Sequence, residues 1–425
     1  MTPEVKQRIE QIRQGIVPEG YVKDKDGIYP RDWASKKIGQ WLKLAERSIV
    51  LQDEEEYQLV TIRRGFGGVD SRGSFLGKNV LVKNYFIVKT GDFIISKRQI
   101  AHGACGIVPP ELDGAVVSNE YNVFLPQDGT NIQMFNLMMQ LPHYKRLFYL
   151  MSDGVHIEKL LFKTQDWMKR TLAMPLLKEQ KKIAEILSTQ DKAIELQERK
   201  IEELKRFKKG CLEKMFPRKG QKVPETRFPG FTGDWEQRKA KELFVSTADK
   251  GYPELPVLSA TQDRGMIRRD ENGINIFHDK KNEAGYKRVL PGQFVIHLRS
   301  FQGGFAHSAI EGITSPAYTV FGFSEPEKHD SEYWKYVFTS KSFIRRLETV
   351  TYGIRDGRSI SYEEFLTLGF VYPSKAEQTA IARYLDKLSD LITLHQRKLE
   401  EMKRQKKALM QLLLTGIVKT KGKVR

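Results

Sequence analysis

The sequence predicts an α+β fold that is built as a repeat: two mixed domains, each followed by a long helix, with the two helices packed against each other. Three observations support this prediction. The chain has 425 residues, which is more than a single hydrophobic core usually accommodates, so two or more domains are expected. One helical segment occurs twice, 198 residues apart. In front of each copy, short apolar runs alternate with turn residues, as in a sheet with many turns.

The repeated helical segment is the strongest sign of duplication. Residues 179–216 align with 377–414 without a gap, and 15 of the 38 positions are identical. Pro175 and Pro373 precede the two copies in the same register. A Glu/Lys-rich helix can match another by composition alone, but a shared proline start with this many ungapped identities indicates a duplicated segment.

Both copies carry one apolar stripe at coiled-coil spacing. Its apolar members are Ile183, Leu187, Ile194, Ile201 and Leu204 in the first copy, and Ile381, Leu385, Leu388, Ile392, Leu399 and Met402 in the second. A helix of this length spans ~57 Å and needs a partner to bury such a stripe. The other copy is the nearest available partner. Gln197 and His395 share one polar position of the stripe, and we interpret both as setting the register.

The repeat extends into the domains. "GDFIISKR" at 91–98 matches "GQFVIHLR" at 292–299, and "SNEYNVF" at 118–124 matches "SPAYTVF" at 315–321. The longer apolar runs "NYFIVKTGDFIISK" and "RVLPGQFVIHLR" predict hairpins around their glycines. Helical spacing predicts helices in residues 131–150 and 331–350.

The expected organisation follows the repeat and the composition of the segments between its parts. A stretch rich in Pro, Gly and charge separates the halves, as an exposed linker does. In chain order we expect an N-terminal helical segment at 1–28, a first mixed domain at 29–174, a spacer helix at 175–216, a linker at 217–230, a second mixed domain at 231–372, a second spacer helix at 373–416 and a basic tail at 417–425.

The charge balance favours a polyanionic partner. Lys and Arg number 71 against 53 Asp and Glu, which gives a net charge of +18. Nucleic acid is the first partner to consider and an acidic membrane surface the second. Cys105 and Cys211 are too few and too far apart for a disulfide framework or a zinc cluster, which fits a reducing cytoplasm. We expect no membrane span, because no run of about 18 apolar residues occurs.

Candidate DNA contacts lie in basic, turn-rich stretches. Arginine can bind guanine O6 and N7, and glutamine can bind adenine N6 and N7. The alternative is that these stretches are ordinary solvated loops. Arg98 and Arg299 are favoured because they align across the repeat. The candidates are Arg63, Arg64, Arg72, Lys78, Lys97, Arg98, Gln99 and His102 in the first half, and Gln262, Arg264, Arg268, Arg269, Arg299, Ser300, Gln302, Tyr352, Arg355 and Arg358 in the second.

Two duplicated signatures connect the chain to a known family. The first reads Gly20-Tyr21, Gly27, Pro30, Asp32-Trp33 and Lys37, of which the second half keeps Gly233-Asp234-Trp235. The second is Pro175, Glu179, Gln180, Ile183, Ala184 and Leu187, repeated as Pro373, Glu377, Gln378, Ile381, Ala382 and Leu385. In this order, over nearly the whole chain, the sequence resembles the DNA specificity subunit of a type I restriction–modification enzyme.

The resemblance implies two target-recognition domains in a pseudo-twofold repeat, held apart by an antiparallel pair of long coiled-coil helices. Each domain would read one half of a split double-stranded DNA target. Two methyltransferase subunits would join this chain to methylate adenine, and two motor-nuclease subunits would join to restrict. S-adenosylmethionine, ATP and Mg would be bound by those partners, with no cofactor and no catalytic residue in this chain. Base-reading residues vary within the family and do not carry over.

Two other functions remain open. The chain could be a coiled-coil scaffold with only non-specific affinity for nucleic acid; two mixed domains in register argue against it. It could also be an autonomous nuclease or methyltransferase. "SPAY" at 315–318 is similar to the tetrapeptide of amino-methyltransferases, but its counterpart "SNEY" lacks the proline and no glycine-rich cofactor loop accompanies it. If the spacer acts as a ruler, lengthening both helices should lengthen the gap between half-sites.

Overall fold

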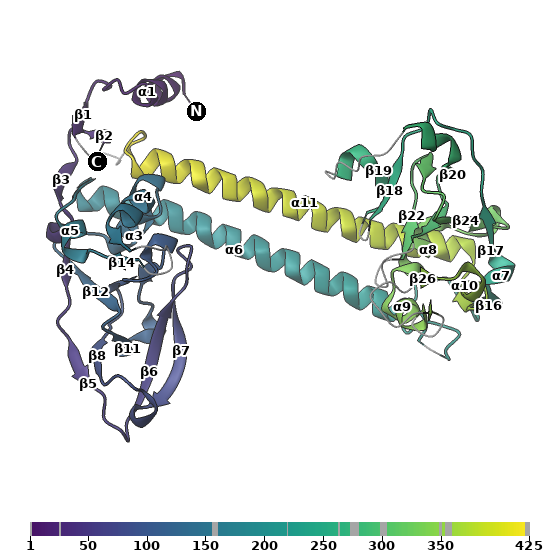
Figure 1. The fold of residues 1–425 in the computed structure, drawn as a ribbon, viewed down its shortest axis with the longest axis horizontal. Coiled ribbons are helices and arrows are strands. Elements are labelled where there is room, and N and C mark those ends of the chain that lie inside the picture. The colour runs from purple at the N-terminus through teal and green to yellow at the C-terminus, as the bar shows by residue number, and fades with distance from the viewer. Residues whose placement is uncertain are drawn as a thin grey trace. The chain divides into compact units, whose positions relative to one another are not determined.

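The computed structural model describes residues 2–24, 27–154, 160–218, 220–261, 264–272, 280–297, 304–347, 351–352 and 359–420. The chain divides into two compact units. The first combines residues 1–197 with 398–425, and the second is residues 198–397 (Figure 1). Both units contain sheets and helices, so the α+β prediction is confirmed.

The core of the first unit forms under a four-stranded sheet of order β10-β9-β12-β4. All neighbours in this sheet are antiparallel. Aromatic side chains fill the space between the sheet and the helices: Phe93 lies edge-on to Phe135 at 5.3 Å, and Phe124 lies edge-on to Trp167 at 5.6 Å. The elements are β4 (Leu42–Leu44), β9 (Phe93–Ser96), β10 (Cys105–Ile107), β12 (Tyr121–Pro126), α2 (Ile38–Trp41), α3 (Ile132–Met139), α4 (Pro142–Leu150) and α5 (Thr164–Met168).

A second sheet of the first unit has five strands in the order β5-β8-β11-β6-β7. Its longest pair is β6 with β7, which Figure 1 shows as the two long arrows of this unit. The strands are β5 (Ser48–Val50), β6 (Glu56–Ile62), β7 (Val69–Leu76), β8 (Asn84–Ile87) and β11 (Val116–Ser118).

The predicted hairpins are wrong. β8 pairs with β5 and β11, whereas β9 pairs with β10 and β12, so the turn at Gly91 carries the chain from one sheet into the other. In the second unit the same run is split between β20 and β21, which also belong to different sheets. Two adjacent apolar strands joined by a glycine turn look like a hairpin in sequence. Here neither strand pairs with the other, and each has its partners elsewhere in the chain.

The second unit repeats the first sheet strand by strand. Its order is β22-β21-β24-β17, and each strand corresponds to β10, β9, β12 and β4 in turn. Smaller two-stranded sheets, β18 with β19 and β20 with β23, replace the five-stranded one. The elements are β17 (Phe244–Thr247), β18 (Leu258–Thr261), β19 (Gly265–Arg268), β20 (Lys287–Val289), β21 (Phe294–Ile296), β22 (Phe305–His307), β23 (Gly312–Thr314), β24 (Thr319–Phe323), α7 (Ala240–Leu243), α8 (Ser331–Phe338), α9 (Lys341–Leu347) and α10 (Tyr362–Phe365).

Short strand pairs complete both units. The helices expected in residues 131–150 and 331–350 are present, but each is interrupted, as α3 with α4 and α8 with α9. The short pairs are β1 (Tyr21–Asp24) with β2 (Gly27–Pro30), β3 (Ala34–Lys37) with β15 (Thr171–Met174), β13 (Ser152–Asp153) with β14 (Leu161–Phe162), β16 (Glu236–Lys239) with β27 (Gly369–Tyr372), and β25 (Thr351–Tyr352) with β26 (Ser359–Ile360).

The two long helices are α6 (Leu177–Lys214) and α11 (Lys375–Leu414). Within each unit they run antiparallel. Lys406 pairs with Asp191 at 2.5 Å in the first unit, and Lys208 donates to Ser389 at 2.7 Å in the second. Of the expected stripe, Ile183, Leu187, Ile201, Leu204, Ile381, Leu385 and Leu388 are buried, and Ile194, Ile392, Leu399 and Met402 are half-buried.

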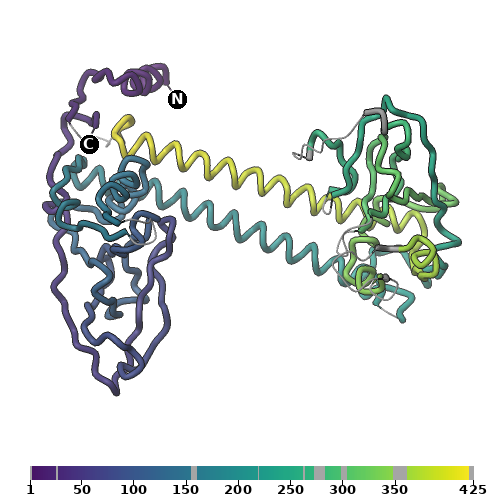
Figure 2. Tube along the Cα trace, in the orientation of Figure 1, coloured from purple at the N-terminus to yellow at the C-terminus, as the bar shows by residue number. Residues whose placement is uncertain are grey.

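The N-terminal segment lies against the residues that follow α11 within the first unit (Figure 2). Helix α1 (Pro3–Arg13) and strand β1 lie on one side of this contact. Arg8 donates to the carbonyl of Ile417 at 2.6 Å, and the Tyr21 hydroxyl donates to the carbonyl of Gly416 at 2.7 Å. Gly416 has a φ of 69° and lies against Pro30 and Trp33, where a Cβ would collide with their side chains. The last turn of α11 thus belongs to the first unit.

Candidate nucleic-acid interface

Two of the predicted DNA-contacting stretches come together in the first unit. The turn between β6 and β7 lies against the single 3-10 turn Ile100–His102 that follows β9. The backbone N–H of Gly65 donates to the His102 carbonyl at 2.7 Å, and that of Phe66 donates to the Gly103 carbonyl at 2.8 Å. The turn that carries Arg63 and Arg64 therefore lies against the turn that follows Lys97, Arg98 and Gln99.

Phe66 fixes this contact. Its φ is 60°, a left-handed conformation that few residues other than glycine adopt. Its ring covers Gly103, where a Cβ would come within 2.9 Å of the ring. Gly103 itself has a φ of 74°. The glycine and the phenylalanine with its left-handed backbone allow the two turns to approach closely.

Arg98 is held by a carboxylate that sequence reasoning missed. Its Nε donates to Glu120 Oε2 at 2.6 Å, and its Nη2 donates to Glu120 Oε1 at 3.3 Å. These hydrogen bonds raise the pKa of the Arg98 guanidinium. Both side chains remain open to solvent, with exposed fractions of 54% and 44%. The pair therefore lies on an accessible surface.

Tyr121 extends this surface toward β7. Burial raises the pKa of the Tyr121 hydroxyl, while its hydrogen bond with Thr61 and the nearby positive charge of Arg72 lower it. Arg72 is exposed on β7. Arg72, Tyr121, Glu120 and Arg98 thus form one polar area, which we call the Arg98 surface.

The other first-half candidates differ in their surroundings. Arg63 forms an ion pair with Asp70 across the β6–β7 turn. Lys78 lies at the opposite end of the β6–β7 ladder, where it pairs with Glu54 at 3.5 Å. The side-chain oxygen of Gln99 is buried and has no hydrogen-bond partner among the described residues. Lys78 is therefore separate from the Arg98 surface, and Gln99 is part of the turn that borders it.

In the second unit, the structure separates the candidates that it describes. Arg264 is exposed in the turn between β18 and β19, and Arg268 is exposed at the far end of β19. Arg269 is half-buried with its guanidinium 6.0 Å from the ring of Tyr286. Of Tyr352 only its place in β25 is described. The candidates Gln262, Arg299, Ser300, Gln302, Arg355 and Arg358 lie outside the described residues.

The sequence held one clue to Glu120. It occupies the third position of "SNEY", and the matched "SPAY" has Ala317 there. A search of the sequence for basic residues alone does not detect this difference between Glu120 and Ala317. The carboxylate becomes visible only when β9 and β12 are seen to be neighbours, since their pairing places Tyr121 opposite Ser96.

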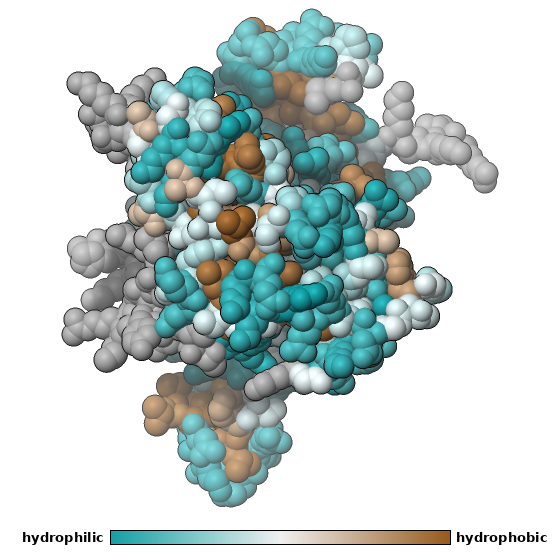
Figure 3. Space-filling view, turned by 90° about the vertical axis from the view of Figure 1, so that its right-hand side faces the viewer, coloured by the Kyte–Doolittle hydropathy of each residue, from teal (hydrophilic) through white to brown (hydrophobic). Residues whose placement is uncertain are grey.

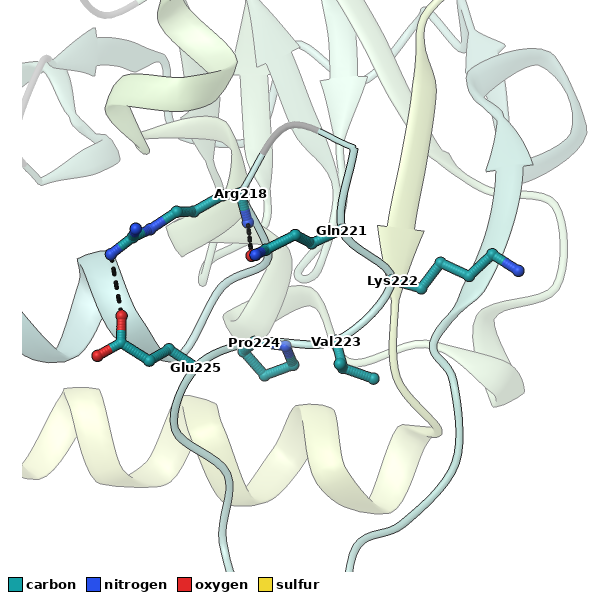
Figure 4. A pocket seen from close by; sticks show the side chains of 6 residues that line it. All are labelled: Arg218, Gln221, Lys222, Val223, Pro224 and Glu225. Carbon is teal, nitrogen blue, oxygen red and sulfur yellow. Dashed lines mark hydrogen bonds and ion pairs between the residues drawn. The ribbon is translucent and has the colours of Figure 1, made fainter.

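A hollow of about 340 Å³ in the linker is lined by Arg218, Gln221, Lys222, Val223, Pro224 and Glu225 (Figure 4). Arg218 pairs there with Glu225 at 2.9 Å, so these charges satisfy each other. No group of three or more His, Cys, Asp or Glu in the described ranges is arranged to bind a metal ion. None of the helices described is long and apolar enough to cross a membrane.

The comparisons with known proteins agree with this picture. Residues 30–206 match the family model for the type I restriction modification DNA specificity domain. The type I restriction enzyme MjaVIII specificity subunit of Methanocaldococcus jannaschii is 24% identical over 92% of this chain and 94% of its own. The putative MjaX specificity subunit of the same organism is 22% identical over 95% and 97%.

Residues 30–206 thus carry a type I restriction modification DNA specificity domain, and the similarity to specificity subunits extends over nearly the whole chain. The resemblance predicted from the duplicated signatures is confirmed. The relatives that the chain matches are named as specificity subunits of type I restriction enzymes.

Solved structures share the fold of this chain. The HsdS subunit from Thermoanaerobacter tengcongensis matches with a TM-score of 0.52 and 16% identity, over 92% of this chain and 98% of its own. The S subunit from M. genitalium matches with a TM-score of 0.51 and 12% identity, over 90% and 96%. A third structure concerns the structural basis of complex assembly and conformational transition of the type I R-M system. It matches with a TM-score of 0.57 and 16% identity, over 92% of this chain and 99% of its own.

Proposed function

We propose that this specificity subunit reads a bipartite DNA target, with one unit for each half-site. The observation that carries the proposal is the repeated sheet, β10-β9-β12-β4 in one unit and β22-β21-β24-β17 in the other. Two copies of one reading scaffold in a single chain suit two half-sites. The loops that differ between the copies, such as "SNEY" and "SPAY", would let each unit read a different sequence.

The exposed basic side chains support DNA as the ligand. The net charge of +18 supplies long-range attraction to phosphates. The Arg98 surface and the β18–β19 turn present exposed arginines on turns, where they can reach base edges or phosphates. The face of the second unit in Figure 3 is mostly hydrophilic, with only small apolar areas between polar ones. Such a surface suits a charged partner.

The chain would act by positioning two methyltransferase subunits for adenine methylation and two motor-nuclease subunits for restriction. S-adenosylmethionine, ATP and Mg would be bound by these partners. Adenine must leave the base stack to be methylated, so the specificity subunit would hold DNA where a bound methyltransferase can flip the base.

Two equivalent leucines support a partner present in two copies. Leu196 and Leu394 are 198 residues apart, and their exposed fractions are 58% and 62%. Leu394 lines a hollow of about 510 Å³ together with Leu391. A single exposed leucine is ordinary on a protein surface, so the support for a partner is that this leucine recurs at the same position of both long helices. A twofold repeated patch suits two copies of one protein, and we assign it to the methyltransferase subunits.

The test is adenine-methylation sequencing of a host that carries the cognate methyltransferase subunit, with and without this chain. A new split motif, methylated once on each strand and present only with this chain, is the expected result. If the two proteins co-purify but no new motif appears, bipartite reading is refuted. The scaffold alternative makes a different prediction: duplexes of any sequence should then compete equally for binding at fixed salt.

A further inference from the structure

The hydrogen bonds of Arg98 leave one edge of its guanidinium available. A guanidinium has five N–H groups. Glu120 accepts from Nε and from Nη2, which together form one edge of the planar guanidinium. The other edge of the guanidinium, formed by Nη1 and the second N–H of Nη2, remains available to bind a ligand. Two parallel N–H groups at this spacing match the O6 and N7 acceptors of guanine in the major groove.

We propose that Glu120 is a positioning residue that holds Arg98 to read one guanine in the half-site of the first unit. This inference rests on the proposed function. A free arginine on a turn samples many rotamers and has to be ordered when it binds. With its side edge held by Glu120, Arg98 presents the remaining edge before DNA arrives.

The backbone keeps both residues in place. Glu120 directly precedes β12, and its carbonyl accepts from the N–H of Lys97 at 2.9 Å. The Gln99 N–H donates to the Ser96 carbonyl at 3.1 Å. Arg98 therefore lies between two anchored neighbours, at the end of a strand whose side chains are all buried. A rigid base for both partners is what a preorganised contact requires.

The second unit differs at the matched position. Ala317 stands where the first unit has Glu120, and the Ala317 N–H donates to Ser315 Oγ at 3.3 Å. The second unit thus has no carboxylate at that position. The proposed contribution of the carboxylate to base recognition is therefore confined to the first unit. Removing the Glu120 carboxylate should affect recognition of only one half-site.

The competing explanation is an exposed ion pair without a role in recognition, as many surface pairs are. The two explanations differ in what E120A changes. A surface pair affects stability slightly and leaves the target unchanged. A positioning residue affects discrimination at one base, and only as long as Arg98 is present.

The test uses the full complex with its methyltransferase subunits and the variants E120A, E120Q, R98A, R98K and the double variant E120A/R98A. E54A is the matched control, since Glu54 forms a similar exposed pair with Lys78 at the other end of β6–β7. The measurement is the rate of methylation of duplexes that carry each base substitution in each half-site. Thermal unfolding of each variant checks that the fold is kept.

We expect E120A and R98A to relax the same single guanine position, each by about tenfold to a hundredfold in discrimination. R98K should relax it as well, because lysine cannot bind two acceptors in parallel. The double variant should be no worse than R98A, and E54A should match the wild type. The inference is overturned if E120A and E120Q keep wild-type discrimination, or if E120A and R98A relax different positions. A wild-type complex that methylates no bipartite motif would instead overturn the proposed function.

Discussion

Gln180 and Gln378 make two equivalent hydrogen bonds in the two units. Each donates its Nε2 to the carbonyl of the proline that starts the motif, Pro175 or Pro373, at 2.8 Å. Each accepts through Oε1 from the backbone N–H of the residue that caps α3 or α8, Asn131 at 2.7 Å or Asp330 at 2.9 Å. Both glutamines are fully buried. The motif thus ties each long helix to the domain that precedes it.

Replacing either glutamine with alanine should destabilise its unit by about 2–3 kcal/mol. The substitution leaves a part-buried backbone N–H and a buried carbonyl without these partners, and each unsatisfied group costs about 1–3 kcal/mol. Urea unfolding of Q180A and Q378A measures the loss. Gln405 on the exposed face of α11 is the control, and Q405A should change stability by less than about 0.5 kcal/mol. Equal effects at all three positions would contradict this role.

The sequence revealed these glutamines as part of a repeated motif, but not what they bind. Their partners lie 48 and 49 residues away and become neighbours only through packing. The same holds for Glu120, which is 22 residues from Arg98 and reaches it because β9 pairs with β12. The repeat, the long helices and the basic turns follow local rules of spacing and composition. The hairpins were mispredicted because glycine turns also join strands of different sheets.

Tyr372 should make the second unit sensitive to alkali. Burial, followed by the negative charge of Glu236, raises the pKa of the Tyr372 hydroxyl to about 12. The folded state then keeps a proton that the unfolded chain loses near pH 10. The stabilisation is complete below pH 10 and is lost as the pH rises toward 12. Between pH 10 and pH 12 the unfolding free energy of the wild type should decrease by about 2 kcal/mol more than that of Y372F.

This effect is measured by urea unfolding of the wild type and Y372F at intervals from pH 9 to pH 12. Below pH 9 the two should differ only by a constant offset. Burial raises the pKa of Tyr121 in the first unit as well, but Tyr121 is half-buried and opposed by Arg72 and Thr61. Y121F is therefore a matched comparison with a smaller expected change. Identical pH profiles for the wild type and Y372F would contradict the assignment.

Leu196 and Leu394 should each control the binding of one methyltransferase subunit. A glutamate at either position puts a charge into the interface that we propose, and binding there should weaken at least tenfold. L196E and L394E should each give a complex with one methyltransferase, and the double variant should give none. Mass measurement of the purified complexes counts the subunits. L161E is the control, because Leu161 is similarly exposed but lies on β14. Two methyltransferase subunits retained by the double variant would remove these leucines from the interface.

The length of the long helices should set the gap between the two half-sites. Inserting seven residues between Gln197 and Glu198, and seven between Arg397 and Lys398, keeps the coiled-coil spacing and adds ~10.5 Å to each helix. At ~3.4 Å per base pair this corresponds to a gap longer by ~3 base pairs. Methylation sequencing with the variant should then yield the same two half-sites with a wider gap. A variant with seven residues in only one helix loses the pairing of the stripes and should lose methylation. If the doubly lengthened variant folds and methylates with the original gap, the helices do not act as a ruler and the spacing must be set by the partner subunits.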